Sequence, residues 1–490
     1  MPRRQDLRRR LLTSAVRRCQ FTLDELWSRY FALGGLGDPD DLDAFLEGTG
    51  PLDELEQDVL TRAVNERLDQ LFSRTRVPYS REIRPALPEA GPLAGLVALL
   101  RGTHLAPTDR LPAVLTTAAE ALDVQAVLLL IDHAEARLVP WLPPGVTPIA
   151  TFGLEGTVCG RAFRTMMPVA QIVAGRPHLW VPVLDGAERL GVLDLTLAHE
   201  GDLDDPALHE QMWWLAHYLG HLITVIGQFG DGVEIARRRQ QPSVSAELVR
   251  QLVPPQTAGT ERVVVTARTE PSVDVGGDVF DYALSDDLAQ FAVIDADGGD
   301  VASGLVAAAV LAAYRHARRE LRPLFDQAQA MHDALGDLLS VPAFANGLVA
   351  ELDLVSGLFR YINAGQPTPL LLRRGRLVRP VTGGHRARLG VESSAIVVGE
   401  EQLEPGDRLL LLTDGVVSAL DDVGTPLGLA GLTDLLVRES DAETPLPEVL
   451  RRLSQEILRR QSGLAHDDFT LMLISWSQDL PRTLSPFACA

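Results

Sequence analysis

The sequence predicts an α+β protein of several domains, and three observations support this. The chain has 490 residues, which at roughly 150 residues per domain suggests about three domains. Apolar residues make up 46% and charged residues 23%, as in ordinary globular protein, so a disordered or fibrous chain is excluded. The hydrophobic pattern is helical at first, then mixes helices with strands, and finally becomes a series of antiparallel hairpins with a few helices.

Residues 1–75 are predicted to form a helical domain, followed by a linker over 76–94. Apolar side chains recur at helical spacing around Leu23, Leu26 and Tyr30, and again over 53–72. The segment 73–92 is rich in proline and arginine and has no periodicity, which is typical of a linker.

Residues 95–229 are predicted to form an α/β sandwich. A helix over 111–122 leads into an apolar strand at 126–132. Two further strands, 178–184 and 190–198, flank a short polar turn and therefore form a hairpin. A terminal helix follows them.

That terminal helix has apolar residues spaced 4, 3, 4, 3 and 4 apart, which is a heptad seam. The seam consists of Leu215, Leu219, Leu222, Ile226, Phe229 and Val233. It has two interpretations that the sequence leaves open: a dimer-forming signalling helix that continues into a linker helix over 230–255, or a helix that packs on its own domain.

Residues 256–478 are predicted to form a layered α+β domain, with a tail over 479–490. Most strands fall in pairs joined by short polar turns, and helices interrupt them in two places. The predicted strands are 263–268, 280–284, 289–296, 347–354, 358–363, 369–373, 377–381, 395–398, 408–413 and 469–476, with a long helix over 301–321.

Composition excludes several classes of function. The net charge is −21, so nucleic acid and anionic membranes are poor partners. All 45 basic residues are arginine, which we attribute to coding composition. Without lysine there is no Schiff base, no Walker A loop and no kinase strand lysine. The three cysteines form no disulfide framework or zinc motif, and no apolar segment is long enough to span a bilayer. We expect a cytoplasmic protein.

Four acidic clusters stand out in the C-terminal domain. Asp278 precedes one predicted strand, Asp295 ends another, Asp414 follows an apolar run, and Asp467 precedes the last strand. A carboxylate at the end of an apolar strand is costly unless its charge is compensated, and a hard divalent cation does this. Each motif alone is commonly just a turn or a cap. The four together predict a site for two divalent ions that activates water for attack on a phosphoryl group.

Residues 250–476 resemble the metal-dependent PPM-type protein phosphatases, in the bacterial branch typified by stage II sporulation protein E (SpoIIE). The resemblance lies in motifs at 250–255, 271–281, 361–365, 403–415 and 467–471, in family order. It implies an αββα layered phosphatase domain that hydrolyses phosphoserine and phosphothreonine with two Mn²⁺ or Mg²⁺ ions and a metal-bound hydroxide. The implied substrate is a phosphorylated anti-sigma-factor antagonist.

Carried over residue by residue, the resemblance implies that Asp278, Asp295, Asp414 and Asp467 hold the metal ions, together with the backbone carbonyl of Ala296. Asp295 is expected to bridge the ions. Asp281 is expected to support the loop rather than to bind metal.

The middle region 95–229 resembles GAF sensor domains. The resemblance lies in residues 155–163, 167–169, 179–184 and 191–195. It implies a pocket for an unidentified small-molecule signal. Cys159 is either a thiol sensor or a small buried core residue, and we favour the core residue. His178 and Trp180 are likewise expected in the core or at its rim.

Some positions depart from the phosphatase pattern. Ile294 stands where the family has glycine, Asp297 and Asp300 lie in a stretch that is usually Ser–Gly–His–Gly, and Gln366 replaces a histidine. They motivate an alternative to the enzyme, namely a degenerate phosphatase that binds a phosphoprotein or serves as a sensory scaffold. Another alternative is that the C-terminal domain is only a dimer scaffold. The candidates for a phosphate-binding arginine are Arg268, Arg386 and Arg388.

Overall fold

The computed structural model describes most of the chain, in two compact units divided at residues 89 and 90. Each unit is taken by itself below. The described residues are 2–71, 77–80, 93–270, 276–298, 301–338, 343–375, 377–392, 395–440, 444–461 and 467–478.

The N-terminal unit is a small helical bundle, as the sequence predicts. Its helices are α1 (Pro2–Cys19), α2 (Leu23–Ala32), α3 (Pro39–Glu47) and α4 (Glu54–Gln70). Thr22 and Asp38 begin α2 and α3 with capping boxes, which satisfy backbone N–H groups that a helix start leaves unpaired. Residues 77–80 of the predicted 76–94 linker are tied to this bundle, because the side-chain amide of Asn65 donates to the carbonyl of Val77 at 2.8 Å. Ala94, at the end of the predicted linker, already begins α5 of the middle domain.

The middle domain is an antiparallel sheet with helices on both faces. Its sheet order is β3-β2-β1-β6-β5-β4. Helices α5, α6 and α8 cover one face over a core that includes Leu128 and Leu193, and α7 covers the other face. The elements are α5 (Ala94–Thr103), α6 (Leu111–Glu120), β1 (Gln125–Ile131), β2 (Arg137–Trp141), β3 (Phe152–Gly153), α7 (Val158–Thr165), β4 (Val169–Val173), β5 (Arg176–Asp185), β6 (Glu188–Thr196) and α8 (Pro206–Ile226).

The predicted heptad seam does not form one continuous helix. Helix α8 ends at Ile226, and its first four seam residues are buried in the core of the middle domain. Phe229 is exposed outside the helix, and Val233 lies on α9 (Gly232–Arg237). Residues 227–229 form a turn after α8. The chain then passes so close to Thr108 that a Cβ at Gly230 would lie 2.5 Å from the threonine methyl group. The predicted linker helix over 230–255 is therefore wrong: α9 and α10 (Val244–Leu252) are two short helices.

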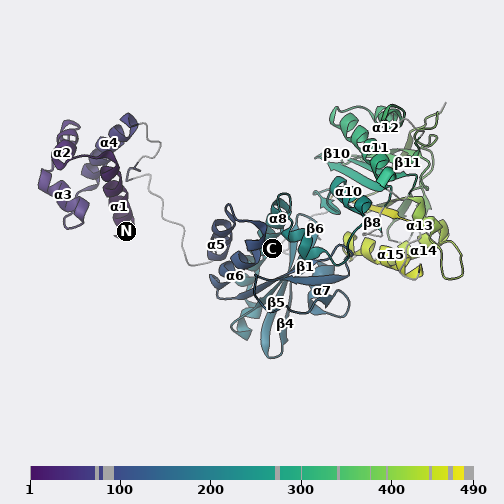
Figure 1. Cartoon of the computed structure of the whole chain (residues 1–490), viewed down its shortest axis with the longest axis horizontal. Helices are drawn as coiled ribbons and strands as arrows, with labels where there is room; N and C mark the ends of the chain where they lie inside the picture. The colour runs from purple at the N-terminus through teal and green to yellow at the C-terminus, as the bar shows by residue number, and fades with distance from the viewer. Residues whose placement is uncertain are drawn as a thin grey trace. The chain divides into compact units, whose positions relative to one another are not determined.

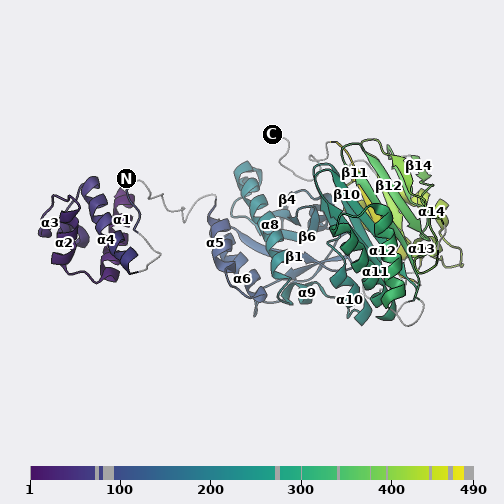
Figure 2. The same cartoon turned by 90° about the horizontal axis from the view of Figure 1, so that it is seen from above.

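The C-terminal domain is an αββα sandwich. Its two sheets have the orders β15-β12-β11-β10-β9 and β14-β13-β16-β17-β8-β7. Figures 1 and 2 show α11 and α12 on one outer face and α13 to α15 on the other. The elements are β7 (Thr257–Gly259), β8 (Val263–Glu270), β9 (Asp278–Leu284), β10 (Leu288–Ala296), α11 (Val301–Arg319), α12 (Leu324–Leu338), β11 (Ala345–Asp353), β12 (Leu358–Ala364), β13 (Leu370–Arg373), β14 (Leu377–Pro380), β15 (Gly399–Gln402), β16 (Arg408–Leu412), α13 (Asp414–Ser418), α14 (Gly428–Glu439), α15 (Leu446–Arg460) and β17 (Phe469–Trp476).

Alternation along β10 explains the layering. Phe291 and Val293 point into the core between the two sheets, whereas Ala292 and Ile294 point to the core under α11 and α12. Successive side chains of a strand face opposite sides, so a strand buried on both faces is apolar throughout. Ile294, where the family has glycine, is thus a packing residue under the helices.

One predicted strand is wrong. Residues 395–398 form no strand, and Val397 makes only an isolated bridge to His385. The ladder with β12 begins at Gly399, opposite Tyr361. The apolar run at 396–398 therefore crosses this neighbouring segment at a single point and does not pair along it.

No helix in the described part of the chain has both the length and the apolar composition to cross a membrane.

We expect Gly220→Ala to destabilise the middle domain. A Cβ at position 220 on α8 would lie 2.1 Å from the carbonyl oxygen of Leu184 on β5, so the helix would have to move off the sheet. The expected loss is roughly 1–3 kcal/mol in the free energy of unfolding, measured by urea denaturation. Gly201→Ala is the control, since a Cβ there meets nothing within 4 Å. Equal stability of both variants would contradict the close approach.

Candidate active site

The fold places the four predicted aspartates where the ends of both sheets meet. Asp278 begins β9 and lies directly opposite Asp295 of β10 in the antiparallel register. Asp414 is the first residue of α13, immediately after β16, and Asp467 lies just before β17. Since β16 and β17 are neighbours in the second sheet, these two aspartates come from adjacent strand ends.

Asp278 is the most buried of these carboxylates, with a relative exposure of 1%. The hydroxyl of Thr413 donates to its Oδ2 at 2.7 Å, and the same hydroxyl accepts the backbone N–H of Thr470 at 2.8 Å. Burial raises the pKa of Asp278 well above its ordinary value, and the negative charges of Asp468 and Asp295 add to this. The site therefore holds a carboxylate whose charge needs compensation.

Asp295 and Asp467 extend the same acidic cluster. Burial raises the pKa of Asp295 to about 6, although the side-chain amide of Asn346 donates to its Oδ2 at 3.0 Å. Desolvation also raises the pKa of Asp467 to about 6, with Asp468 and Asp414 as its negative neighbours. Neighbouring negative charges thus add to the effect of burial at both Asp295 and Asp467.

Asp468 builds the loop that carries Asp278. Its Oδ2 accepts the backbone N–H groups of Gly276, Gly277 and Asp278 at 3.0–3.1 Å. Three convergent amides form a concave anion site, here filled by a carboxylate of the same chain. Gly276 and Gly277, just before β9, are thereby held to the start of β17.

Two glycines permit this approach of backbones. A Cβ at Gly277 would lie 2.1 Å from the carbonyl oxygen of Ala296, and one at Gly415 would lie 2.1 Å from that of Asp468. The GlyGlyAsp and ThrAspGly motifs therefore carry their glycines for close packing beside the acidic residues.

The donor set fits a hard divalent cation by its chemistry. Carboxylates around a buried strand end, with a backbone carbonyl at Ala296 beside them, are the oxygen ligands that Mg²⁺ and Mn²⁺ prefer. Raised pKa values at Asp278 and Asp295 show that negative charge is disfavoured there, which a cation would reverse. Within the described residues, however, no three His, Cys, Asp or Glu side chains stand at the spacing of metal ligands.

Sequence reasoning missed three polar residues of this site. Asp468 had a visible signal, since it follows Asp467 directly, and Thr413 lies in the ThrAspGly motif. Asn346 had none, because it lies in β11, 51 residues after the carboxylate that accepts its hydrogen bond. Its role depends on strand pairing, in which Asn346 is the partner of Asp295.

Two of the three candidate phosphate-binding arginines lie elsewhere. Arg268 is buried in ion pairs with Glu270 and Glu135, and Arg386 is buried and donates to the carbonyl of Ala328. Arg388 remains: it is half-buried and pairs with Asp297, which follows Ala296.

Asp281, Gln366 and Asp300 are the remaining positions that the sequence analysis named in the C-terminal domain. Asp281 pairs with Arg315 and Arg318 of α11, each at 2.7 Å, which is the supporting role expected of it. Gln366 is buried after β12, where its backbone and the side chain of Asn363 exchange hydrogen bonds. Asp300 lies outside the described residues.

The middle domain's candidates also have packing roles. Cys159 is buried in the core under α7, and burial raises the pKa of its thiol, which does not favour a reactive thiolate. His178 pairs with Asp194 at 2.8 Å and stacks on Trp180.

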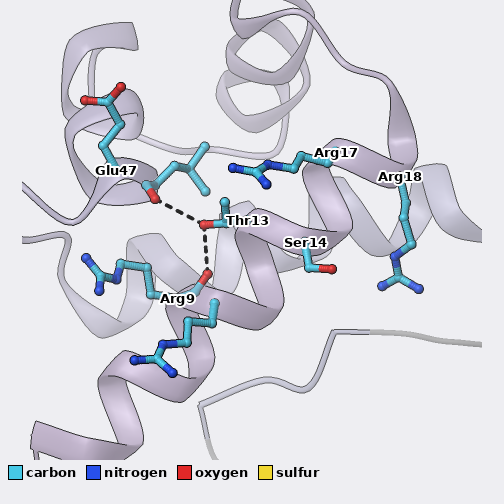
Figure 3. A pocket seen from close by; sticks show the side chains of 8 residues that line it. Arg9, Thr13, Ser14, Arg17, Arg18 and Glu47 are labelled. Atoms are coloured by element: carbon cyan, nitrogen blue, oxygen red, sulfur yellow. Dashed lines mark hydrogen bonds between the residues drawn. The ribbon is translucent and has the colours of Figure 1, made fainter.

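The N-terminal unit has a basic hollow of about 500 Å³ that lies along α1. Arg9, Arg10, Arg17 and Arg18 line it, with Glu47 opposite. In Figure 3 the guanidinium groups of Arg17 and Arg18 extend in different directions. This hollow is therefore not a convergent anion site.

Comparison with known proteins identifies the C-terminal domain. Residues 285–477 match the family model of Stage II sporulation protein E (SpoIIE), which confirms the family predicted for this part of the chain. The match does not reach the middle domain, so its GAF-like character remains a prediction.

Solved structures resemble the chain over less than half its length. The RsbU and RsbW domains of Rv1364c from Mycobacterium tuberculosis are 26% identical, with a TM-score of 0.41, over 47% of this chain and 64% of that one. The SiaA PP2C domain of Pseudomonas aeruginosa is 21% identical, with a TM-score of 0.38, over 44% and 86%. SpoIIE from Bacillus subtilis is 19% identical, with a TM-score of 0.38, over 44% and 63%. At such TM-scores these likenesses establish no activity.

We expect Thr413→Val to weaken Mn²⁺ binding about tenfold, measured by titration calorimetry. The change keeps the side-chain shape but removes the donor to Asp278 and the acceptor for the N–H of Thr470. A hydrogen bond to a charged group contributes roughly 1.5–3 kcal/mol, so the free energy of unfolding should fall as well. Thr433→Val, on the exposed face of α14, serves as the control. Unchanged stability and Mn²⁺ affinity would mean that Thr413 does not position Asp278.

Proposed function

We propose that the chain, whose C-terminal domain is of the SpoIIE type, is a metal-dependent phosphatase of phosphoserine and phosphothreonine in proteins. The observation that carries the proposal is the acidic cluster: four aspartates scattered over 190 residues of sequence lie at the ends of two sheets. Burial and neighbouring negative charges raise the pKa values of Asp278, Asp295 and Asp467. A cluster of this kind is costly to fold unless it binds cations.

Asp278, Asp295, Asp414, Asp467 and the carbonyl of Ala296 would hold two Mn²⁺ or Mg²⁺ ions. Bound there, the ions would supply an activated water and stabilise negative charge on a phosphoryl group. No lysine or cysteine nucleophile is needed, which agrees with a chain that has no lysine.

The chain's own residues position and balance this site. Asn346 orients Asp295, and Asp468 with Thr413 fixes the loop and side chain of Asp278. Arg388 is the residue we assign to the substrate phosphate, because it is the candidate arginine beside Ala296 and Asp297. A planar guanidinium binds phosphate through two parallel N–H groups, for which it would exchange its pairing with Asp297.

The substrate we propose is a phosphorylated anti-sigma-factor antagonist, on the strength of the SpoIIE family match. The middle domain would then be the sensor that receives a small-molecule signal. The first four residues of the heptad seam are buried in its core, so they do not support a dimer.

A second candidate function is a binding module without turnover. Its support is the ion pair between Arg388 and Asp297, which engages the arginine assigned to phosphate with an extra carboxylate. This candidate predicts that a phosphoprotein binds but is not hydrolysed.

We expect the wild-type chain to release phosphate from a phosphoserine protein when Mn²⁺ is added, and to stop when EDTA removes it. Asp414→Asn should lower the rate at least a hundredfold, because it takes one negative ligand from the acidic cluster. The measurement is phosphate release under single-turnover conditions, with Mn²⁺ binding followed in parallel.

The matched control is Asp422→Asn, on an exposed turn that follows α13. It should keep wild-type turnover. Full activity of Asp414→Asn would remove this residue from the site, and phosphoprotein binding without Mn²⁺-dependent release would favour the binding module.

A further inference from the structure

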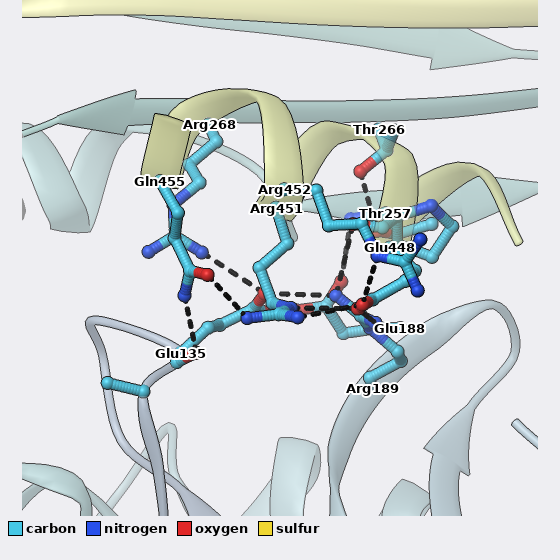
Figure 4. Close-up of polar contacts among 12 residues, drawn as sticks. Glu135, Glu188, Arg189, Thr257, Thr266, Arg268, Glu448, Arg451, Arg452 and Gln455 are labelled. Carbon is cyan, nitrogen blue, oxygen red and sulfur yellow. Dashed lines mark hydrogen bonds and ion pairs between the residues drawn. The ribbon is translucent and has the colours of Figure 1, made fainter. Parts of the chain in front are cut away.

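A buried set of charged side chains joins the middle domain to the C-terminal domain. We name it the interdomain ion network and define it as Glu135, Arg189, Arg268, Glu448 and Arg451. Figure 4 shows Glu448 and Arg451 on α15 pointing toward Glu135 and Arg189 of the middle domain. Four of the five are at most 3% exposed, and Glu135 is 7% exposed.

Arg189 is the centre of the contact. Its guanidinium donates to Glu135 at 2.9 Å within the middle domain, and to Glu448 at 3.3 Å and the carbonyl of Pro447 at 3.1 Å on α15. It also lies over the ring of Phe163, 4.5 Å from the centroid. One side chain is thus fixed by both domains.

Two further arginines connect the domains from the opposite side. Arg268 of β8 reaches Glu135 at 3.1 Å and donates to the carbonyl of Ala134 at 2.7 Å. Arg451 of α15 pairs with Glu448 at 2.7 Å and with Glu155 of the middle domain at 2.7 Å. Arginines of each domain therefore pair with carboxylates of the other domain.

The charged side chains of the interdomain ion network have their cross-domain partners only while the two domains are docked. Burial opposes ionisation of Glu448, yet hydrogen bonds from Arg451 hold the pKa of this carboxyl below its ordinary value. If the domains separated, water would have to replace every cross-domain partner, and loss of one partner alone leaves a charge buried and uncompensated. The interface is therefore stable as a whole and sensitive to single substitutions.

The network lies against the strands that carry the acidic cluster. Helix α15 packs on β8 and β17, and Arg268 is the register partner of Leu471, four residues after Asp467. Next to this pair, the hydroxyls of Thr269 and Thr470 are 2.8 Å apart.

From Thr470 a hydrogen-bond path leads to the acidic cluster. Its backbone N–H donates to the hydroxyl of Thr413, and that hydroxyl donates to Asp278. Hydrogen bonds therefore join Thr269 to Asp278 through the hydroxyl and backbone N–H of Thr470 and the hydroxyl of Thr413, and the backbone of β8 joins Thr269 to Arg268.

We propose that docking of the middle domain through the interdomain ion network holds β8, β17 and α15 in the arrangement that positions Asp278, so that the docked state is the active one. None of the contacts described for the interdomain ion network involves Asp278, Asp295, Asp414 or Asp467, which favours support over occlusion. The proposal rests on the proposed phosphatase function. A signal that loosens docking would then lower activity by weakening the metal site.

The experiment is a double-mutant cycle across the interface in the full chain, with Arg189→Gln, Glu448→Gln and both together. Hydrogen exchange of residues 446–460 and 469–476 is measured without metal, and the Mn²⁺ concentration for half-maximal phosphate release is measured in parallel. We expect each single variant to speed exchange of both segments and to raise that Mn²⁺ concentration, each by about tenfold. The double variant should add little to either single one, because the two groups act together.

Arg379→Gln is the matched control, since its pair with Glu401 joins β14 to β15 within the C-terminal domain and is half exposed. It should leave both measurements unchanged. Glu155→Gln removes the rim contact to Arg451 and, within the middle domain, a pair with Arg164. Of the two measured segments it should speed exchange of 446–460 alone, which keeps the test available if a central variant unfolds.

Unchanged exchange of 446–460 and 469–476 in a folded Arg189→Gln would overturn the docking. Faster exchange with an unchanged Mn²⁺ requirement would overturn the coupling to Asp278. If the wild type releases no phosphate at all, the proposed function fails, and the exchange data alone decide whether the interface exists.

Discussion

The repulsion among carboxylates at the meeting point of two sheets is the constraint on which this structure depends. Asp278 and Asp295 are register partners on adjacent strands, so the fold holds their negative charges together whatever surrounds them. Burial makes both harder to ionise. The hydrogen bonds from Thr413 and Asn346 offset part of this cost, and a bound cation would offset more of it. The neighbouring glycines, the hydroxyl of Thr413 and the amide cradle around Asp468 serve to maintain this arrangement.

The sequence predicted the elements that depend on local pattern. Strands such as β8, β10 and β17 either alternate between apolar and polar residues or are apolar throughout, and turns of Gly, Asp and Ser separate them. Their places in the sequence and the aspartates at their ends could therefore be predicted. The pattern misled at the linker helix over 230–255 and at the strand over 395–398. Heptad spacing at Leu215 to Val233 left two interpretations open, and the helix packed on its own domain is the one that the structure has for the first four seam residues. The apolar run at 396–398 resembles a strand although it pairs at Val397 alone.

Contacts between residues that are distant in the chain could not be predicted from the sequence. Asn346 orients Asp295 only because β10 and β11 pair in one register, and Arg189 meets Glu448 across 259 residues. Neither residue belongs to a motif. Their roles follow from tertiary packing, which pairs β10 with β11 and brings β6 of the middle domain against α15.

The absence of lysine has a structural consequence at this interface. Arg189 contacts two carboxylates, a backbone carbonyl and an aromatic ring at once. A planar guanidinium with five donors satisfies such a set, whereas a lysine ammonium concentrates its charge at one strongly hydrated point. Arginine also keeps its charge when buried. A chain that draws every positive charge from arginine can therefore bury a charged contact between domains, and the same composition that excludes lysine-based catalysis favours this form of communication between the middle domain and the acidic cluster.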